Sequence, residues 1–153
     1  MISIIIPVFN SENTIEILVH NIVEGFGKHY EFEVILINDS SVDRSEEKCK
    51  KLVEKYSNVA LYSLSKNVGE HNAVMAGLNN CSGDYAVIMD DDLQHSANSL
   101  LDLIKFGIKE KNNFDVVYTY YDKMKYNPFR NFGRRFNDLV ANLLLDKPKF
   151  LYL

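Results

Sequence analysis

Three consecutive carboxylates, Asp90, Asp91 and Asp92, directly follow the apolar segment 85–89. Like charges at this spacing repel one another, so a compensating cation is expected, and Mg²⁺ or Mn²⁺ prefers such oxygen ligands. Because alternate residues of an extended segment point the same way, Asp90, Asp92 and Gln94 are predicted to face one metal site. Asp91 then points elsewhere. A solvated acidic turn that begins the next helix is the alternative interpretation.

Polar residues also follow the other segments that are expected to be strands. They are Asn10, the segment 38–41 and the segment 65–67, which includes Lys66. Ligands of open α/β sheets bind beyond the carboxyl ends of the strands. We therefore expect these residues and the acidic triplet to lie along one edge of a sheet.

Apolar, β-branched runs alternate along the chain with segments of helical periodicity. Strands are expected at 3–8, 32–38, 59–64, 85–89 and 115–120, and helices at 15–26, 43–56, 71–80, 96–108 and 132–144. Asp43 with Glu46 is typical of a capping box, Ser96 of a helix cap, and Val74, Met75 and Leu78 are expected to face inward. The alternation predicts an α/β fold, a mostly parallel sheet sandwiched by helices, with 1–153 as a single domain.

Composition is that of a soluble globular protein, with 46% hydrophobic and 25% charged residues among 153. The apolar runs are too short to cross a bilayer, and no signal peptide is recognisable. Cys49 and Cys81 are too few for a disulfide framework or a metal cluster. We expect both to be buried apolar residues in a reducing cytoplasm.

The net charge of −4 is unevenly distributed along the chain. Residues 1–122 hold 10 basic and 19 acidic side chains, a balance of −9, whereas 123–149 hold seven basic and two acidic side chains, a balance of +5. The basic segment indicates an anionic partner, such as a phosphate or a membrane surface, and a solvated helix face is the alternative. Nucleic acid is not expected as a partner, because the acidic body would repel it.

Several phosphate-handling classes lack their motifs in this chain. No G-x-G-x-x-G follows 3–8 and no P-loop occurs, which argues against dinucleotide oxidoreductases and P-loop NTPases. After the first expected strand this chain has Val8, Phe9 and Asn10. Haloacid dehalogenase phosphatases and phospho-receiver domains need an acidic pair at this position, and sugar nucleotidylyltransferases need a glycine-rich loop there. The remaining interpretation is an acidic edge that holds a diphosphate through a metal ion.

Four motifs, at 3–12, 38–43, 67–69 and 84–94, resemble family 2 glycosyltransferases in order and spacing. Within this family the chain most resembles the polyprenyl-phosphate glycosyltransferases, such as dolichol-phosphate mannose synthase and undecaprenyl-phosphate aminoarabinose transferase. The segments 133–137 and 142–149 are similar to the second of these. The resemblance implies a GT-A fold and an enzyme that uses a nucleotide sugar.

The resemblance also implies roles for individual residues. Pro7, Phe9 and Glu12 would line the nucleotide pocket, and Asp39 would accept a hydrogen bond from the ring N–H of uracil or guanine. Asp90 would lie by the ribose and diphosphate, Asp92 and Gln94 would bind the metal, and Lys66 would help to neutralise the diphosphate. A strand end at Pro7 and helix caps at Glu12 and Asp39 are the structural alternatives.

Two departures from the family pattern stand out. The middle residue of the acidic triplet is usually small, and here Asp91 is expected to add a further ligand or to face water. His95, Ser96 and Ala97 replace an acidic or Asn residue followed by prolines. We interpret His95 as a surface residue at a helix start, with an acid/base role as the alternative.

The predicted reaction is an inverting transfer from a UDP- or GDP-sugar to a polyprenyl phosphate. A phosphate acceptor is already ionised and needs cationic positioning, for which Arg130 and Arg135 are the candidates. Transfer to a hydroxyl of a cell-surface polysaccharide, with a base from later in the chain, and a non-catalytic nucleotide-sugar-binding module are the alternatives. The chain is expected to be the N-terminal part of a longer protein, peripheral to the cytoplasmic face of the membrane, with transmembrane helices downstream.

Overall fold

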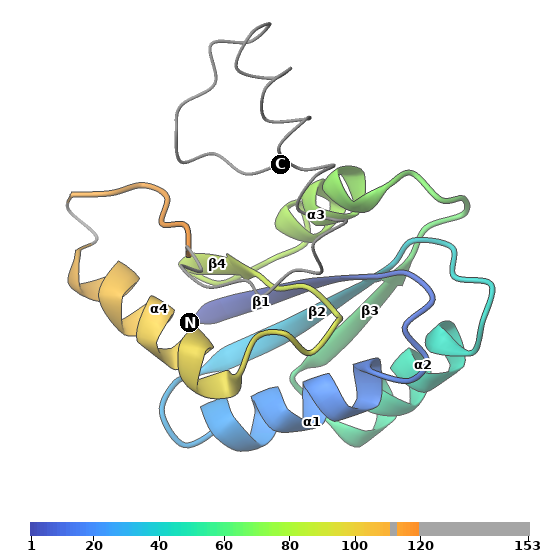
Figure 1. The fold of residues 1–153 in the computed structure, drawn as a ribbon, viewed down its shortest axis with the longest axis horizontal. Coiled ribbons are helices and arrows are strands. Elements are labelled where there is room, and N and C mark those ends of the chain that lie inside the picture. Colours follow the sequence, from blue (N-terminus) through green and yellow to red (C-terminus); the bar gives the residue numbers. More distant parts are fainter. Residues whose placement is uncertain (111–112, 120–153) are drawn as a thin grey trace, which may run out of the picture. The chain divides into compact units, whose positions relative to one another are not determined.

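A computed structural model describes residues 1–110 and 113–119 of the chain (Figure 1). The predicted helix at 132–144, the basic segment 123–149 and its candidates Arg130 and Arg135 lie outside the described residues. The secondary-structure elements belong to one compact unit, Met1–Val117. No helix in the described ranges is long and apolar enough to span a membrane.

Parallel strands form the centre of this unit, in the order β3-β2-β1-β4. The elements are β1 (Ile2–Val8), α1 (Ile15–Phe26), β2 (Phe32–Asn38), α2 (Ser45–Lys55), β3 (Val59–Ser63), α3 (Glu70–Leu78), β4 (Tyr85–Ile88) and α4 (Ala97–Lys109). Val8 pairs with Asn38, so β1 and β2 end at the same edge. The predicted α/β class with a parallel sheet is confirmed.

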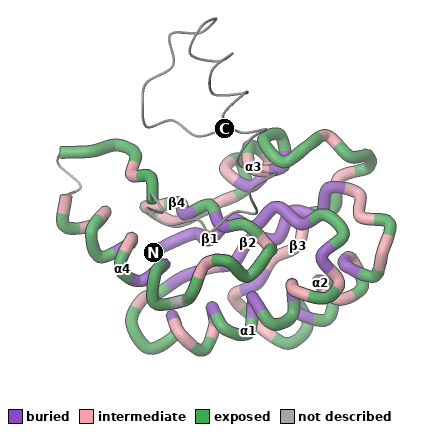
Figure 2. The backbone as a smooth tube through the Cα atoms, viewed as in Figure 1, coloured by how far each residue is buried: buried purple, intermediate pink, exposed green. Residues whose placement is uncertain are grey.

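Helices cover both faces of the sheet, with α1, α2 and α4 on one face and α3 on the other (Figure 1). Alternate residues of β1 serve the two faces, because Ile4 and Ile6 pack with α1 and α4 whereas Ile5 packs toward α3. Figure 2 shows that β1 and β2 are buried along most of their length. Strands buried on both faces explain the continuous apolar runs of the sequence.

The inward face predicted for α3 is only partly correct, since Leu78 packs against the core without being fully buried. Ala73 and Gly77 are the buried residues of this helix, whereas Met75 is 54% exposed. Small residues on the inner face allow the helix backbone to approach Ile5 and Ile37 closely. A periodicity count based on large apolar residues cannot detect such a face.

The helix caps agree only in part with the sequence prediction. Ser96 caps α4 as predicted, since its Oγ accepts a hydrogen bond from Ser99 N at 3.1 Å. The capping box of Asp43 is wrong, because α2 begins at Ser45 and Asp43 accepts from Ser45 N at 2.9 Å and from Glu12 N at 3.0 Å. Asp43 therefore joins two loops.

The fifth predicted strand is not formed over 115–119, the part of 115–120 that the structure describes. Val116 in this segment is 63% exposed. The apolar pattern that favoured a strand here therefore lacks the burial that stabilises one.

Candidate functional site

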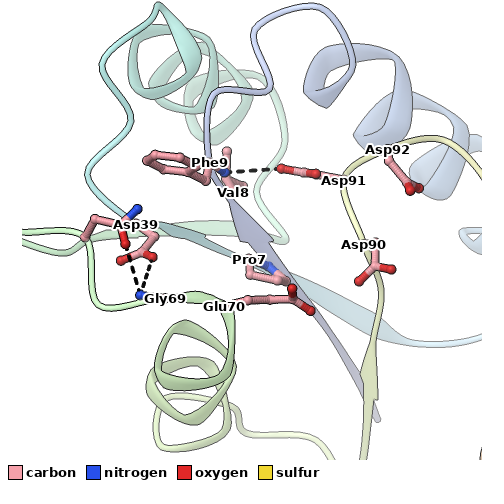
Figure 3. Close-up of a pocket in the computed structure, with 10 residues that line it drawn as sticks. Pro7, Val8, Phe9, Asp39, Gly69, Glu70, Asp90, Asp91 and Asp92 are labelled. Carbon is pink, nitrogen blue, oxygen red and sulfur yellow. Dashed lines mark hydrogen bonds between the residues drawn. The ribbon is translucent and has the colours of Figure 1, made fainter. Parts of the chain in front are cut away.

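A pocket of about 380 Å³ lies where β1, β2 and β4 end (Figure 3). Four segments far apart in the sequence form its walls. The lining residues are Pro7, Val8, Phe9, Asp39, Asn67, Gly69, Glu70, Asp90, Asp91 and Asp92. Of the described residues that line it, none is Lys or Arg. The pocket is therefore apolar and aromatic at β1 and polar, mostly acidic, elsewhere.

Asp39 directly follows β2 and is only 3% exposed. Its Oδ1 accepts a hydrogen bond from Val68 N at 2.8 Å, and its Oδ2 accepts one from Gly69 N at 2.9 Å. Gly69 precedes α3 with φ 86°, a conformation that glycine adopts without steric strain. Asp39 thus fixes the loop before α3. The sequence analysis predicted base recognition or a helix cap for Asp39 and did not predict this role.

The acidic triplet leaves the sheet beyond β4. Met89 N still donates to Ile5 O at 3.0 Å, and the chain then turns away from the ladder. Asp91 reaches toward Phe9, whereas Asp90 and Asp92 point away from it (Figure 3). The side chains of the triplet therefore alternate in direction.

The expectation that Asp91 simply faces water is wrong, because the protein itself contacts its carboxylate, and the expectation that it adds a metal ligand stays a prediction. Its Oδ2 accepts a hydrogen bond from Phe9 N at 3.2 Å and another from Ser11 Oγ. The carboxylate is engaged by the protein itself because the fold brings the end of β1 beside the triplet.

The backbone is left-handed at three non-glycine residues around this edge. Asn10 has φ 56°, Ser40 has φ 58° and Leu93 has φ 63°. Asn10 compensates in part, because its Oδ1 accepts a hydrogen bond from Val42 N at 3.0 Å. Strained backbone of this kind costs roughly 1–3 kcal/mol per residue and concentrates at functional sites.

Among the predicted site residues that the structure describes, three are outside the set that lines the pocket. The Glu12 carboxylate instead accepts hydrogen bonds from Arg44 N and Arg44 Nε, both at 3.2 Å. Lys66 and Gln94 are exposed, and Gln94 contacts Asp92 through its backbone N–H at 3.0 Å. The structure brings together Pro7, Phe9, Asp39, Asp90 and Asp92 from the predicted set.

Glu70 is a lining residue that the sequence analysis missed. It lies in the first turn of α3, directly after Gly69, and its side chain extends beneath Pro7 (Figure 3). Its position shortly after the segment 65–67 was the available signal, since that segment was already expected at the same edge.

The described residues contain no group of three or more His, Cys, Asp or Glu side chains arranged to hold a metal ion. Mg²⁺ and Mn²⁺ sites in enzymes that handle phosphates commonly use one or two carboxylates, and water and phosphate oxygens complete the coordination. Asp90 and Asp92, both exposed at the pocket, fit this smaller donor set.

Comparison with known proteins extends over nearly the whole chain. Residues 3–151 match the family model Glycosyl transferase family 2. Undecaprenyl-phosphate 4-deoxy-4-formamido-L-arabinose transferase of Edwardsiella ictaluri (strain 93-146) is 31% identical over 147 residues, which are 94% of this chain and 43% of that protein.

Solved structures show the same fold. The mannosyltransferase PcManGT from Pyrobaculum calidifontis, in complex with GDP-Man and Mn²⁺, superposes with a TM-score of 0.62 at 23% identity, covering 69% of this chain and 32% of that one. S. aureus TarS 1-349 in complex with UDP-GlcNAc gives 0.59 at 22% identity, covering 80% and 38%. The chain spans less than half the length of each of these proteins. Its sheet and helices are those of the GT-A fold, and the chain belongs to glycosyl transferase family 2.

Proposed function

We propose that this chain binds the donor of an inverting glycosyltransferase, a UDP- or GDP-sugar, together with Mg²⁺ or Mn²⁺, for transfer to a lipid phosphate. The observation that carries the proposal is the pocket at the carboxyl ends of the strands, apolar at β1 and acidic at the triplet. A nucleotide sugar has the matching division, with a planar base at one end and a diphosphate at the other.

The base would lie at the β1 end of the pocket. Phe9 is 48% exposed and offers an aromatic face on which a base can stack. Asp39 would accept the ring N–H of uracil or guanine, because each carboxylate oxygen has a second lone pair beyond its bond to the loop. Adenine has no such ring N–H and would be disfavoured.

The diphosphate would lie at the acidic end, where it needs a cation. Carboxylates repel a diphosphate, and no Lys or Arg is found among the described lining residues to offset them. Asp90 and Asp92 would hold a divalent ion, which when bound supplies charge stabilisation to the departing nucleoside diphosphate. The Mn²⁺ and GDP-Man in the PcManGT complex support the use of a divalent ion with the donor.

The lipid-phosphate acceptor is proposed from two observations. The Edwardsiella relative is named for undecaprenyl phosphate, and residues 123–149 carry a balance of +5. Arg130 and Arg135 would hold the acceptor phosphate, because guanidinium groups bind phosphate in a bidentate manner. An ionised phosphate attacks without a general base. The same basic residues would draw the chain to the anionic cytoplasmic face of a membrane.

The donor is tested by titrating UDP, GDP and ADP into the chain by calorimetry, with Mn²⁺ and with chelator. UDP or GDP should bind at least tenfold more tightly with Mn²⁺, and Asp92→Ala should remove this difference. Asp102→Ala is the matched control, because Asp102 is an exposed carboxylate on α4 outside the pocket. Equal affinity with and without metal would refute the metal assignment, and preference for ADP would refute the role of Asp39.

The acceptor is tested with liposomes and with the full-length protein. The chain should co-sediment with anionic vesicles at low salt, and the double substitution Arg130→Ala/Arg135→Ala should weaken this binding. Glycosyl transfer to a soluble saccharide, without transfer to undecaprenyl phosphate, would contradict the lipid-phosphate acceptor.

A further inference from the structure

The middle carboxylate of the triplet joins two walls of the pocket. Asp91 Oδ2 accepts from Phe9 N at 3.2 Å and from Ser11 Oγ. Both donors follow β1, whereas Asp91 follows β4. The two hydrogen bonds therefore connect segments that only the fold brings together.

The connection begins where the sheet ends. The β1–β4 ladder ends with Ile5 opposite Ile88, and Met89 N donates to Ile5 O beyond it. From Asp90 onward the triplet is outside the strand, and the next residue after it, Leu93, is left-handed. The Asp91 carboxylate continues the connection between the two segments past the end of the ladder.

Ser11 links this contact to the core. It is 7% exposed, its N–H donates to Ser45 Oγ at 2.7 Å, and its carbonyl accepts from Ile15 N at 3.0 Å at the start of α1. Ser45, at the start of α2, is fully buried. Asp91 is thus held by a residue that is itself fixed between two helices.

We propose that Asp91 is a positioning residue, which aligns the neighbouring carboxylates Asp90 and Asp92 and fixes the backbone of Phe9, without binding the metal or the nucleotide itself. The proposal rests on the proposed function, because alignment matters only if Asp90, Asp92 and Phe9 bind a donor. Without the two hydrogen bonds, the triplet could change its orientation relative to Phe9. Binding of the nucleotide sugar would then have to order the triplet, and this entropy cost would weaken binding.

Both hydrogen bonds end on one oxygen, and this permits a sharp test. Asparagine has a single carbonyl oxygen, which can accept from Phe9 N and Ser11 Oγ as Oδ2 does. Asp91→Asn therefore keeps the connection and removes the charge, whereas Asp91→Ala removes both. Ser11→Ala removes one of the two donors and leaves the triplet unchanged.

The variants are compared by calorimetric titration with UDP or GDP, whichever binds the wild type more tightly, in the presence of Mn²⁺. Asp91→Ala should weaken binding about tenfold, Ser11→Ala by a smaller factor, and Asp91→Asn by less than about threefold. Asp102→Ala is again the control and should bind as the wild type does. Wild-type affinity for the nucleotide in Asp91→Ala overturns the proposal. An equal loss of affinity in Asp91→Asn and Asp91→Ala also overturns it, because it would indicate that the charged carboxylate binds the metal.

Amide hydrogen exchange at Phe9 separates this proposal from the donor assignment. Exchange at Phe9 N should be faster in Asp91→Ala than in the wild type and Asp91→Asn, with no nucleotide present. If the wild type binds neither nucleotide with Mn²⁺, the proposed function fails and the positioning role fails with it. If the nucleotides bind but Phe9 exchange is the same in all three proteins, the positioning role alone is refuted.

Discussion

Gly77 of α3 faces Ile5 of β1 so closely that a Cβ atom on Gly77 would lie 2.3 Å from Ile5 Cγ2. Ile5 is fully buried, so it has no free space into which to move. Gly77→Ala should therefore lower the free energy of unfolding by about 1–3 kcal/mol, through overpacking. Chemical denaturation followed by circular dichroism measures the change.

Gly107 of α4 is the matched control, because a Cβ there would meet nothing within 4 Å. Gly107→Ala should leave stability unchanged or raise it by about 0.5–1 kcal/mol, since alanine is the better helix former. Equal destabilisation by both substitutions would contradict the close approach of α3 to the sheet.

Asp39 uses both carboxylate oxygens, one for Val68 N and one for Gly69 N. Asparagine can accept at only one of these positions and would direct an NH₂ group at the other donor. Asp39→Asn should therefore lower the free energy of unfolding by about 1 kcal/mol, because Val68 N or Gly69 N loses one hydrogen bond, and Gly69 N keeps its bond to Asn67 Oδ1 at 3.1 Å. Asp91→Asn, at a carboxylate that uses one oxygen, should lower it by clearly less in the same denaturation assay.

Glu33 makes stability depend on pH. Burial raises the pKa of its carboxyl, but hydrogen bonds from Ser3 Oγ at 2.6 Å and from Ser82 N at 2.7 Å outweigh burial and bring the pKa below its ordinary value of 4.5. A lowered folded-state pKa gives stability above pH 4.5 that is lost as the pH falls through the folded-state pKa. Glu33→Gln should therefore be less stable than the wild type at pH 7, and the gap should narrow in acid.

Urea denaturation between pH 7 and pH 3 measures this difference in the free energy of unfolding between the wild type and Glu33→Gln. Glu54→Gln, at an exposed carboxylate of α2, is the control and should show no such narrowing. A gap that stays constant or widens in acid would show that Glu33 does not supply the pH dependence.

Cys49 should be chemically inert in the folded protein. It is fully buried, and burial together with nearby carboxylates raises the pKa of its thiol from 9.0 to about 12. The thiolate is the reactive form, so its fraction falls on the order of a thousandfold. In Cys81→Ser, which leaves Cys49 alone, a thiol reagent at pH 8 should react only after denaturant is added. Rapid labelling of the native variant would contradict the burial of Cys49.

β1 and β2 were predictable because burial on both faces leaves a continuous apolar run. The predicted β2 coincides with Phe32–Asn38, and β1 begins one residue before the predicted segment. The inner face of α3 was not predictable in this way. Ala73 and Gly77 permit a close contact because they are small, and hydrophobic periodicity gives such residues little weight.

The candidate site was also predictable only in part. The meeting of Pro7, Phe9, Asp39 and the triplet follows from the rule that parallel strands place their carboxyl ends at one edge. The partners of individual carboxylates do not follow, because Asp91 with Ser11 and Glu12 with Arg44 depend on loop conformations. Local spacing predicted where the carboxylates gather, and only tertiary structure shows which of them are already engaged.

The strand order also determines when the pocket can form during synthesis. β1 is an inner strand, and its Ile2 pairs with Phe32 on one side and with Tyr85 on the other. Because the N-terminus is synthesised first, β1, α1 and β2 can associate while the opposite edge of β1 still lacks its partner. Open strand edges pair readily with other chains. The nascent chain is thus exposed to mispairing until β4 emerges, and the acidic wall of the pocket is the last part to be completed.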